Sequence, residues 1–503
     1  MEFLKLKPKF TTSLKTVKIK IKKDPRIFVY IMVILYVFLF TLLSFRSYFS
    51  FTSSNDLCVW DHRVWEMASG RPLYGVLEKI EANSISWAVH FSPITIFIAA
   101  VYFFVPTPLL LLFIQSLFLG IGAIPVYELA RKKLASNAGG LIFSLSYLLY
   151  PALQNANLFE FHPVVISVPL LIWTFYFAEM GSYKKTVILS LFSLFCQENV
   201  TGPVMFMGIY FILRKKRNIG LTLFLSGLFW LIFVSFLIMP IVYRTTTLQY
   251  LSRLSELGNT PSEILATVLS NPVYAFTRSF FQDRMEILLQ MFSPLSFLSF
   301  FSPVLLIALP EYALNMLTNL PCLMKMGYCL VLVIPFTFIA AVYGAKRILS
   351  FLPNKICSIK VSNIIFAVIL FTSIYSSLLF SPLWGHGFSW LNFSLPNSGP
   401  DDHYLKLENT INSIPSNSTL LLPANMCPHA SHFEDLYTFE LYFNDIKQKN
   451  TTRKNVNFMI IDRTTFQRLK QDDIEILERK ISEDFIKINQ TDGIEIYRKR
   501  NDQ

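Results

Sequence analysis

Charged residues are scarce in this sequence. Only 16% of the 503 residues are Asp, Glu, Lys or Arg, whereas 53% are hydrophobic and 48 are phenylalanine. Soluble globular domains carry about 25% charged residues, so this balance excludes an ordinary soluble protein. The composition therefore predicts an α-helical polytopic membrane protein.

Cysteine is also scarce, and the spacing of the cysteines matches neither a metal site nor a disulfide framework. Several of them lie in or beside apolar runs, so we interpret the cysteines mainly as packing residues, with a disulfide or a metal site as the alternative. They are Cys58, Cys196, Cys322, Cys329, Cys357 and Cys427. A nucleotide-binding loop is missing as well. The GxG pattern at Gly120 and Gly122 has no strand before it and is typical of helix packing.

We expect no cleavable signal peptide at the amino terminus. Residues 1–26 are rich in lysine and precede an apolar run that is long enough to span a bilayer. The net charge of +12 might suggest a nucleic acid partner. Much of the positive charge lies directly before the first predicted span, as the positive-inside rule describes for cytosolic segments. We therefore expect no nucleic acid partner, a cytosolic basic arm over 1–26 and a location in the plasma membrane.

Apolar runs over residues 27–381 predict about eleven transmembrane helices. The segment 90–105 is expected to be re-entrant or interfacial, because four basic clusters then share the cytosolic side. Those clusters are Arg131-Lys132-Lys133, Lys184-Lys185, Arg214 to Arg217 and Lys346-Arg347. The predicted spans lie near 27–49, 107–130, 138–152, 164–180, 186–197, 200–213, 219–243, 285–300, 303–318, 328–345 and 361–381.

The composition changes after Ser381, and residues 382–503 predict a soluble α/β domain. Helical patterns cover 404–414 and 472–482, and strand-like runs cover 419–422, 457–461 and 494–498. Four N-x-Ser/Thr sequons agree with an extracytoplasmic location, at Asn392, Asn417, Asn450 and Asn489.

Two outer loops are expected, over 53–90 and 244–284. The first is dense in ionisable and aromatic side chains, and it is predicted to form one wall of a site just outside the bilayer. The second has the apolar spacing of a helix on the membrane surface, or of a simple connector. Polar residues that should reach the first loop are His90, Glu160, His162 and Glu198. The short helices predicted around 186–213 should place Glu198 below the outer surface, where an ionisable group is costly unless it is solvated or paired. Glu198 is therefore a functional candidate, with a structural ion pair or helix cap as the alternative.

Six motifs in this order resemble a prokaryotic family of multi-pass membrane proteins known as domain of unknown function 2079. The resemblance runs from about Asn55 to Arg347 and weakly into the tail. The motifs are NDLCVWDHRVWEMASGRPLY, HFSPI, QSLFLGIGAIPVYELARKKL, YPALQNANLFEFHP, CQENVTGPVMFMGIYFILRKKRNIG and LIALPEYALNML. That family is similar to the C-fold (GT-C) glycosyltransferases, which take a sugar from a polyprenyl phosphate on the outer side of the membrane and use an acidic residue of the first outer loop.

The resemblance implies a GT-C-like fold and a polyprenyl-phosphate-linked sugar as donor, with an acceptor that stays unidentified. It matches Asp56 to the loop aspartate, and His90, His162 and Glu198 to later motifs. The chain departs from the family where Gln197 and Asn199 replace a usual cation and aspartate, and where a histidine expected before Pro335 is missing.

Glycosyl transfer needs a base for the acceptor hydroxyl and groups that stabilise the departing phosphate. We assign Asp56 as the base, with a pKa raised if water is excluded, and Asp61 as the second choice. Arg63, His90, His162 and Glu198 are the candidates for binding substrate and phosphate. A divalent cation, Mg²⁺ or Mn²⁺, could be held by Asp56, Glu160 and Glu198. A transporter or flippase and a non-catalytic membrane scaffold are the alternative functions.

Overall fold

The computed structural model describes most of the chain. The amino-terminal arm, residues 71–89 of the expected first outer loop, and the sequons at Asn392 and Asn450 lie outside the described residues. The described residues are 24–53, 55–70, 90–242, 254, 256–258, 260–274, 277, 282–317, 328–356, 359–384, 402–433, 435–439, 442–443, 456–464 and 471–500.

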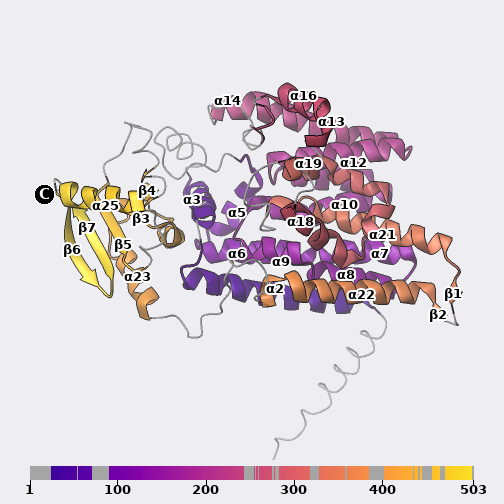
Figure 1. Cartoon of the computed structure of the whole chain (residues 1–503), viewed down its shortest axis with the longest axis horizontal. Coiled ribbons are helices and arrows are strands. Elements are labelled where there is room, and N and C mark those ends of the chain that lie inside the picture. The colour runs from indigo at the N-terminus through magenta and orange to yellow at the C-terminus, as the bar shows by residue number, and fades with distance from the viewer. Residues whose placement is uncertain are drawn as a thin grey trace, which may run out of the picture.

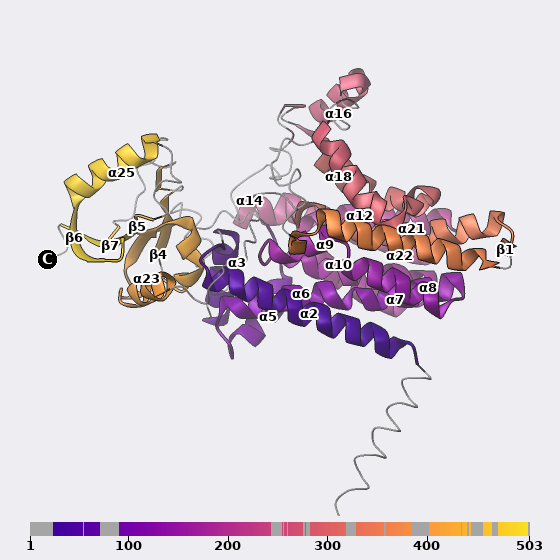
Figure 2. The same ribbon diagram turned by 60° about the horizontal axis from the view of Figure 1, so that its bottom comes forward.

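The first three quarters of the chain form a helical domain, in which most helices run along the long axis of the molecule (Figure 1). Figure 2 shows the same bundle from a second direction, with α3 and the carboxy-terminal sheet at one end. The helices are α2 (Arg26–Phe49), α3 (Asn55–Ala68), α5 (Ile94–Tyr102), α6 (Pro108–Ile121), α7 (Ala123–Leu134), α8 (Asn137–Leu148), α9 (Pro151–Leu158), α10 (Ser167–Glu179), α11 (Tyr183–Leu194), α12 (Thr201–Leu213), α13 (Arg217–Phe233), α14 (Met239–Val242), α16 (Pro261–Ser270), α18 (Gln282–Phe292), α19 (Leu309–Leu317), α21 (Ile334–Phe351) and α22 (Val361–Phe380).

Short helical turns connect these helices, and a two-stranded hairpin joins α21 to α22. The turns used below are η1 (Pro163–Ile166), η2 (Glu198–Val200), η5 (Leu298–Phe301), η6 (Pro303–Ala308) and η7 (Tyr328–Leu330), and the hairpin is β1 (Lys355–Ile356) with β2 (Ile359–Lys360).

Five helical stretches in the described part of the chain are long and apolar enough to cross a membrane. They coincide with five of the eleven predicted spans: Arg26–Phe49, Pro108–Leu134, Arg217–Ile238, Ile334–Phe351 and Val361–Phe380. The other predicted spans correspond to shorter helices, so the count of eleven stays a prediction. Helix α5 has 9 residues and rises only about 13.5 Å, too little to cross a hydrocarbon core of about 30 Å.

The outward faces of the long helices are apolar. On α2, Ile34, Leu35 and Phe38 are each more than 60% exposed, and Phe371 on α22 is 68% exposed. Such a surface is unfavourable in water and matches a lipid environment. The bundle is therefore a membrane domain whose polar groups face inward.

The GxG pattern serves close helix packing, as predicted. A Cβ atom on Gly120 would lie 2.8 Å from Val37 of α2, and one on Gly122 would lie 2.1 Å from the Tyr147 hydroxyl. Because only glycine permits these approaches, both positions fix how α2 and α8 pack against the α6–α7 stretch.

The carboxy-terminal domain is a five-stranded mixed sheet with helices on its faces. Its order is β4-β3-β5-β7-β6, with β3 parallel to β4 and β5, and with β7 antiparallel to β5 and β6. The elements are α23 (Asp402–Asn412), β3 (Thr419–Leu422), η9 (Ala424–His429), β4 (Asp435–Thr438), β5 (Phe458–Asp462), α25 (Gln471–Asp484), β6 (Phe485–Thr491) and β7 (Ile494–Lys499). Every predicted helix and strand of this domain is present, and β4 and β6 were not predicted.

Alternation along β3 explains how the sheet is covered. Leu420 and Leu422 pack with Leu407 of α23, whereas Leu421 points to the opposite face and packs with Leu477 of α25. The α23 side also contains residues that belong to the membrane domain, among them Val59 of α3. The two domains consequently share one hydrophobic core at this end of the bundle.

The four basic clusters gather at the other end of the bundle. The Glu179 carboxylate pairs with Lys133 and lies 3.5 Å from the Lys216 amine, and Arg26 at the start of α2 pairs with Glu128 at 2.8 Å. The hairpin of β1 and β2 lies at this same end (Figure 1). The long axis of the molecule therefore separates a basic end from the end that carries α3 and the sheet.

Candidate functional site

The ionisable segment predicted as a loop is in fact the helix α3. Its 14 residues contain no glycine or proline, and side chains are buried almost all around it. The density of ionisable side chains had suggested a loop. The helix is instead enclosed between α5 and the turn η9 of the carboxy-terminal domain.

Asp61 joins α3 to the carboxy-terminal domain and is fully buried. It accepts hydrogen bonds from the hydroxyls of Tyr102, at 2.5 Å, and of Ser431, at 2.6 Å. His432 Nε2 lies 3.1 Å from the same carboxylate. His62 Nδ1 lies 2.6 Å from the Ser431 carbonyl oxygen. Asp61 is thus a docking residue between the two domains, and these contacts argue against the role of second-choice base.

A disulfide crosses the same interface and corrects the interpretation of the cysteines as mainly packing residues. Cys58 of α3 is bonded to Cys427 of η9, with 369 residues between them in the sequence. Cys329 is disulfide-bonded as well. Spacing could not reveal the Cys58–Cys427 bond, because its partners meet only when the two domains dock. Cys196 is buried and free, as expected of a packing residue.

Asp56, in the first turn of α3, faces His162. Its Oδ2 lies 3.5 Å from His162 Nε2, and its side chain is 44% exposed. The other nitrogen of His162 lies 3.3 Å from the Glu160 carbonyl oxygen, and the imidazole stacks on Tyr328 with ring centroids 3.6 Å apart. The histidine is therefore held on three sides and presents one nitrogen to the carboxylate.

Glu160 caps α3 from a distant part of the chain. Its Oε2 accepts a hydrogen bond from the Leu57 backbone N–H at 2.9 Å, as a favourable anion at a helix amino terminus. Its backbone has φ of 109°, a conformation that costs about 1–3 kcal/mol in a residue other than glycine. Gln115 compensates by donating to the Glu160 carbonyl oxygen and by accepting from the His162 N–H. This framework fixes Glu160 and His162 below Asp56.

His90 and Glu198 form the second half of the site. His90 Nδ1 lies 2.7 Å from Glu198 Oε1, and the other carboxylate oxygen accepts from the Phe91 N–H at 3.0 Å. Arg63 of α3 stacks over Trp60 and reaches the His90 carbonyl oxygen at 3.4 Å. Glu198 therefore fixes the segment before α5 against η2 and α12.

The electrostatic environment lowers the pKa of Asp56, contrary to the expected rise. Desolvation of the half-buried carboxyl acts to raise its pKa, but the hydrogen bond with His162 and the electrostatic interactions with His162 and His90 outweigh this effect. Asp56 consequently carries its negative charge at neutral pH. A carboxylate in that state can accept a proton from an approaching hydroxyl.

The predicted site residues separate into two groups. Asp56 interacts electrostatically with both His90 and His162, and Arg63, Glu160 and Glu198 support this group through the contacts above. Asp61 belongs to the docking interface. Among the described residues, no three His, Cys, Asp or Glu side chains are grouped so that they could hold a metal ion. The carboxylates of Glu160 and Glu198 are instead engaged by backbone N–H groups and by His90.

The replacements at Gln197 and Asn199 also have partners. Gln197 Nε2 lies 3.2 Å from His90 Nδ1, and Asn199 donates to Glu311 Oε1 at 3.3 Å. These side chains, with Asn315 and others, line a cavity of about 20 Å³ beside His90, which is room for one water molecule. Neutral amides therefore stand where a cation and an aspartate were expected from the family resemblance.

Sequence reasoning missed several residues of this region. Gln115 and Glu311 are buried polar side chains inside apolar helices, which is itself a signal of function. Tyr328 stacks on His162 and lies in the stretch before Pro335 where a histidine was expected. No sequence pattern indicated Ser431 and His432, because their contacts with Asp61 form only when the two domains dock.

The fold and the site together define a helical membrane protein, in which the polar helix α3 is joined by a disulfide to a carboxy-terminal α/β domain. The chain belongs to the family described as predicted membrane protein DUF2079, whose model matches residues 46–496. The match includes the carboxy-terminal domain, beyond the range suggested by the motifs. No curated protein matches the sequence significantly.

Proposed function

We propose that this protein is a membrane glycosyltransferase that moves a sugar from a polyprenyl-phosphate donor to an acceptor hydroxyl. The observation that carries this proposal is the state of Asp56. It is 44% exposed and paired with His162, whereas the Glu198 side chain is 4% exposed and that of Asp61 is 0% exposed. Among the candidate carboxylates, Asp56 is the one that an incoming hydroxyl can reach.

The chemical step follows from that arrangement. The Asp56 carboxylate accepts the proton of the acceptor hydroxyl while the oxygen attacks the anomeric carbon from the side opposite the phosphate. The bond between the anomeric carbon and the phosphate oxygen breaks, polyprenyl phosphate leaves, and the sugar inverts its configuration. Removal of a general base typically slows such a step by about 10²–10⁴-fold.

His162, His90 and Arg63 support the departing phosphate in this proposal. His162 is nearest to Asp56, and Arg63 acts mainly by positioning the segment of His90. A divalent cation would bind together with the phosphate at Asp56, since carboxylate and phosphate oxygens suit Mg²⁺ or Mn²⁺. Membrane lipid would surround the polyprenyl chain of the donor.

The orientation of the protein is part of the proposal. Disulfides persist in oxidising compartments, so the Cys58–Cys427 bond favours an extracytoplasmic location for α3 and the carboxy-terminal domain. The basic clusters at the opposite end favour the cytosol. Both arguments support the proposal that the reaction takes place at the outer face of the plasma membrane.

The test uses the full chain purified in lipid nanodiscs with polyprenyl-phosphate sugars. Release of polyprenyl phosphate is measured for the wild type, for Asp56→Asn and for the exposed-surface control Asp472→Asn. We expect at least a 100-fold loss with Asp56→Asn and no change with the control. EDTA followed by Mg²⁺ or Mn²⁺ decides whether a cation takes part. Wild-type protein that releases nothing from any donor, or an Asp56→Asn variant with full activity, refutes the proposal.

A further inference from the structure

A second polar region lies far from α3, at the basic end of the bundle. A hollow of about 490 Å³ there is lined by four cations and, among the described residues, by no carboxylate. They come from three helix ends: Lys133 from α7, Arg214 directly after α12, and Lys346 with Arg347 from α21. Cationic side chains from separate parts of the sequence thus gather around one hollow, and together they attract a negatively charged group.

Three of these cations are available to a ligand. Lys133 is paired with Glu179 and lies over the Tyr343 ring. The other three side chains, those of Arg214, Lys346 and Arg347, are exposed. Within the described part of the chain, no carboxylate lies within ion-pair distance of these three.

The same hollow has an apolar side. Leu134, Phe301, Pro303 and Leu349 contribute to its lining. Beyond it, Phe300, Phe301 and Leu306 on η5 and η6 are each at least 50% exposed. A soluble anion would use only the cations, whereas a phospholipid would use both the cations and the apolar strip.

We propose that this hollow binds the phosphate-bearing headgroup of an anionic membrane phospholipid, with an acyl chain over η5 and η6. The site is separate from Asp56 and needs no glycosyl transfer. It would fix the ends of α7, α12 and α21 to one leaflet of the bilayer.

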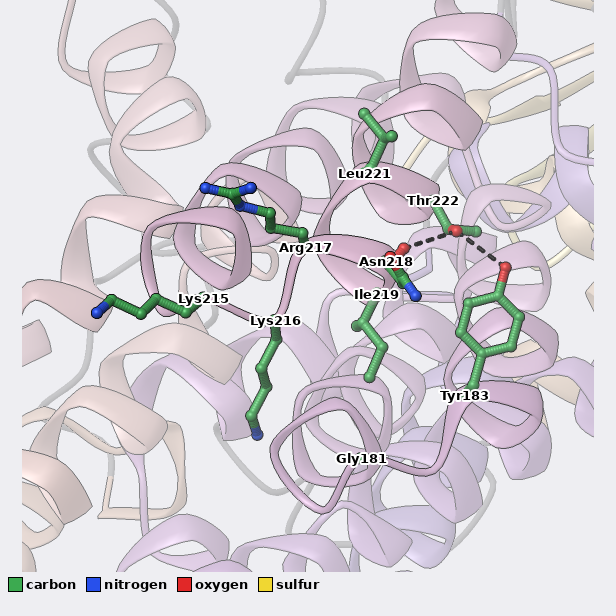
Figure 3. Close-up of a pocket in the computed structure, with 9 residues that line it drawn as sticks. All are labelled: Gly181, Tyr183, Lys215, Lys216, Arg217, Asn218, Ile219, Leu221 and Thr222. Carbon is green, nitrogen blue, oxygen red and sulfur yellow. Dashed lines mark hydrogen bonds between the residues drawn. The ribbon is translucent and has the colours of Figure 1, made fainter.

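A neighbouring hollow of about 860 Å³ is larger but differently built. Figure 3 shows that the cationic ends of Lys215, Lys216 and Arg217 point in different directions there. Two of its other polar groups, Tyr183 and Thr222, are hydrogen-bonded to each other at 2.9 Å. This second hollow therefore supplies a matched control from the same face of the protein.

The test measures lipid retention by native mass spectrometry on full-length protein in neutral detergent. Phosphatidylglycerol is titrated against phosphatidylcholine with identical chains, and soluble glycerol phosphate serves as competitor. The test variant replaces Arg214, Lys346 and Arg347 with alanine. The control likewise replaces Lys215 and Arg217, which line the second hollow, together with the exposed Lys184, which follows the lining residue Tyr183. We expect the wild type and the control to retain phosphatidylglycerol, and the test variant to retain it at least tenfold more weakly. Millimolar glycerol phosphate should not displace the lipid from the wild type.

Ser350→Glu adds a negative charge to the lining without removing any cation, and it should also weaken retention at least tenfold. It keeps the test valid if the triple variant does not fold. The proposal is wrong if phosphatidylcholine binds as tightly, if both triple variants lose binding equally, if glycerol phosphate displaces the lipid, or if Ser350→Glu has no effect.

Discussion

Replacement of Asp61 by asparagine should loosen the carboxy-terminal domain from α3. The carboxylate is fully buried and accepts from Tyr102 and Ser431, with His432 within hydrogen-bond distance. Hydrogen bonds to a charged group contribute about 1.5–3 kcal/mol each. Asparagine keeps one oxygen acceptor but turns an amide donor toward other donors. We therefore expect a cost of about 2–4 kcal/mol in docking free energy.

Hydrogen–deuterium exchange measures this loss where it occurs. The amides of Met426, Ala430 and Phe433 donate to backbone carbonyls within the docked turn, so they report its opening. A docking cost of about 2–4 kcal/mol corresponds to roughly 30- to 800-fold more frequent opening, since 1.4 kcal/mol is a factor of ten. Exchange at these amides should accelerate by at least tenfold in Asp61→Asn.

The exposed Asp472 supplies the matched control, because Asp472→Asn removes the same charge from α25. Its exchange at the docked turn should equal that of the wild type. A double-mutant cycle with Ser431→Ala should give a coupling energy of about 1–3 kcal/mol. Unchanged exchange in Asp61→Asn, or a coupling energy near zero, would refute the assignment of Asp61 as a docking residue.

Three further predictions concern the frame around the site. In Cys58→Ser, the disulfide-linked peptide pair that contains Cys427 should be missing from a non-reducing digest, and the thermal transition should fall by several degrees. A wild-type digest without that peptide pair would contradict the bond. Burial lowers the pKa of His429 to about 4, although its hydrogen bond to the Tyr48 carbonyl acts in the opposite direction. As the pH falls, the unfolded state therefore binds the proton before the folded state does. The contribution of His429 to stability should be full above pH 6.5 and should fall by about 3 kcal/mol as the pH approaches 4. His429→Phe keeps a stacked ring and should flatten the pH profile of thermal unfolding over this range, and a profile like that of the wild type would contradict the assignment. Gly122→Ala should destabilise the membrane domain by about 1–3 kcal/mol in denaturant unfolding, because its Cβ would lie 2.1 Å from the hydroxyl of Tyr147. Adding Tyr147→Phe should recover part of this loss. If the free-energy changes of the two substitutions simply add in the double variant, the clash is excluded.

The helices and most of the sheet could be predicted from the sequence, because their signals are local. Long apolar runs indicated all five helices that are long enough to span, and short β-branched or leucine-rich runs indicated β3, β5 and β7. Strand β4 contains a single aliphatic residue, Leu436, whereas the equally short β3 contains three leucines. Strand β6 is exposed over nearly its whole length, so no continuous apolar run indicates it.

The site was predicted in part, because motif order indicates proximity but not contacts. Asp56, His90, His162 and Glu198 were expected to converge, and His90 and Glu198 are indeed paired at 2.7 Å. The helical form of α3 and the role of Asp61 depend on the docked domain. That contact joins residues separated by more than 360 positions, which no local pattern reports.

The role of Asp56 as the base is tested most directly by the single-turnover rate of polyprenyl phosphate release. This rate is compared between the wild type and Asp56→Asn at equal donor saturation. Asp56 faces His162 and is ionised at neutral pH because its pKa is lowered by the neighbouring histidines, although burial opposes this. We predict a rate at least 100-fold lower for Asp56→Asn, with donor binding and the thermal transition unchanged. An Asp56→Asn rate equal to that of the wild type would contradict the assignment of Asp56 as the base.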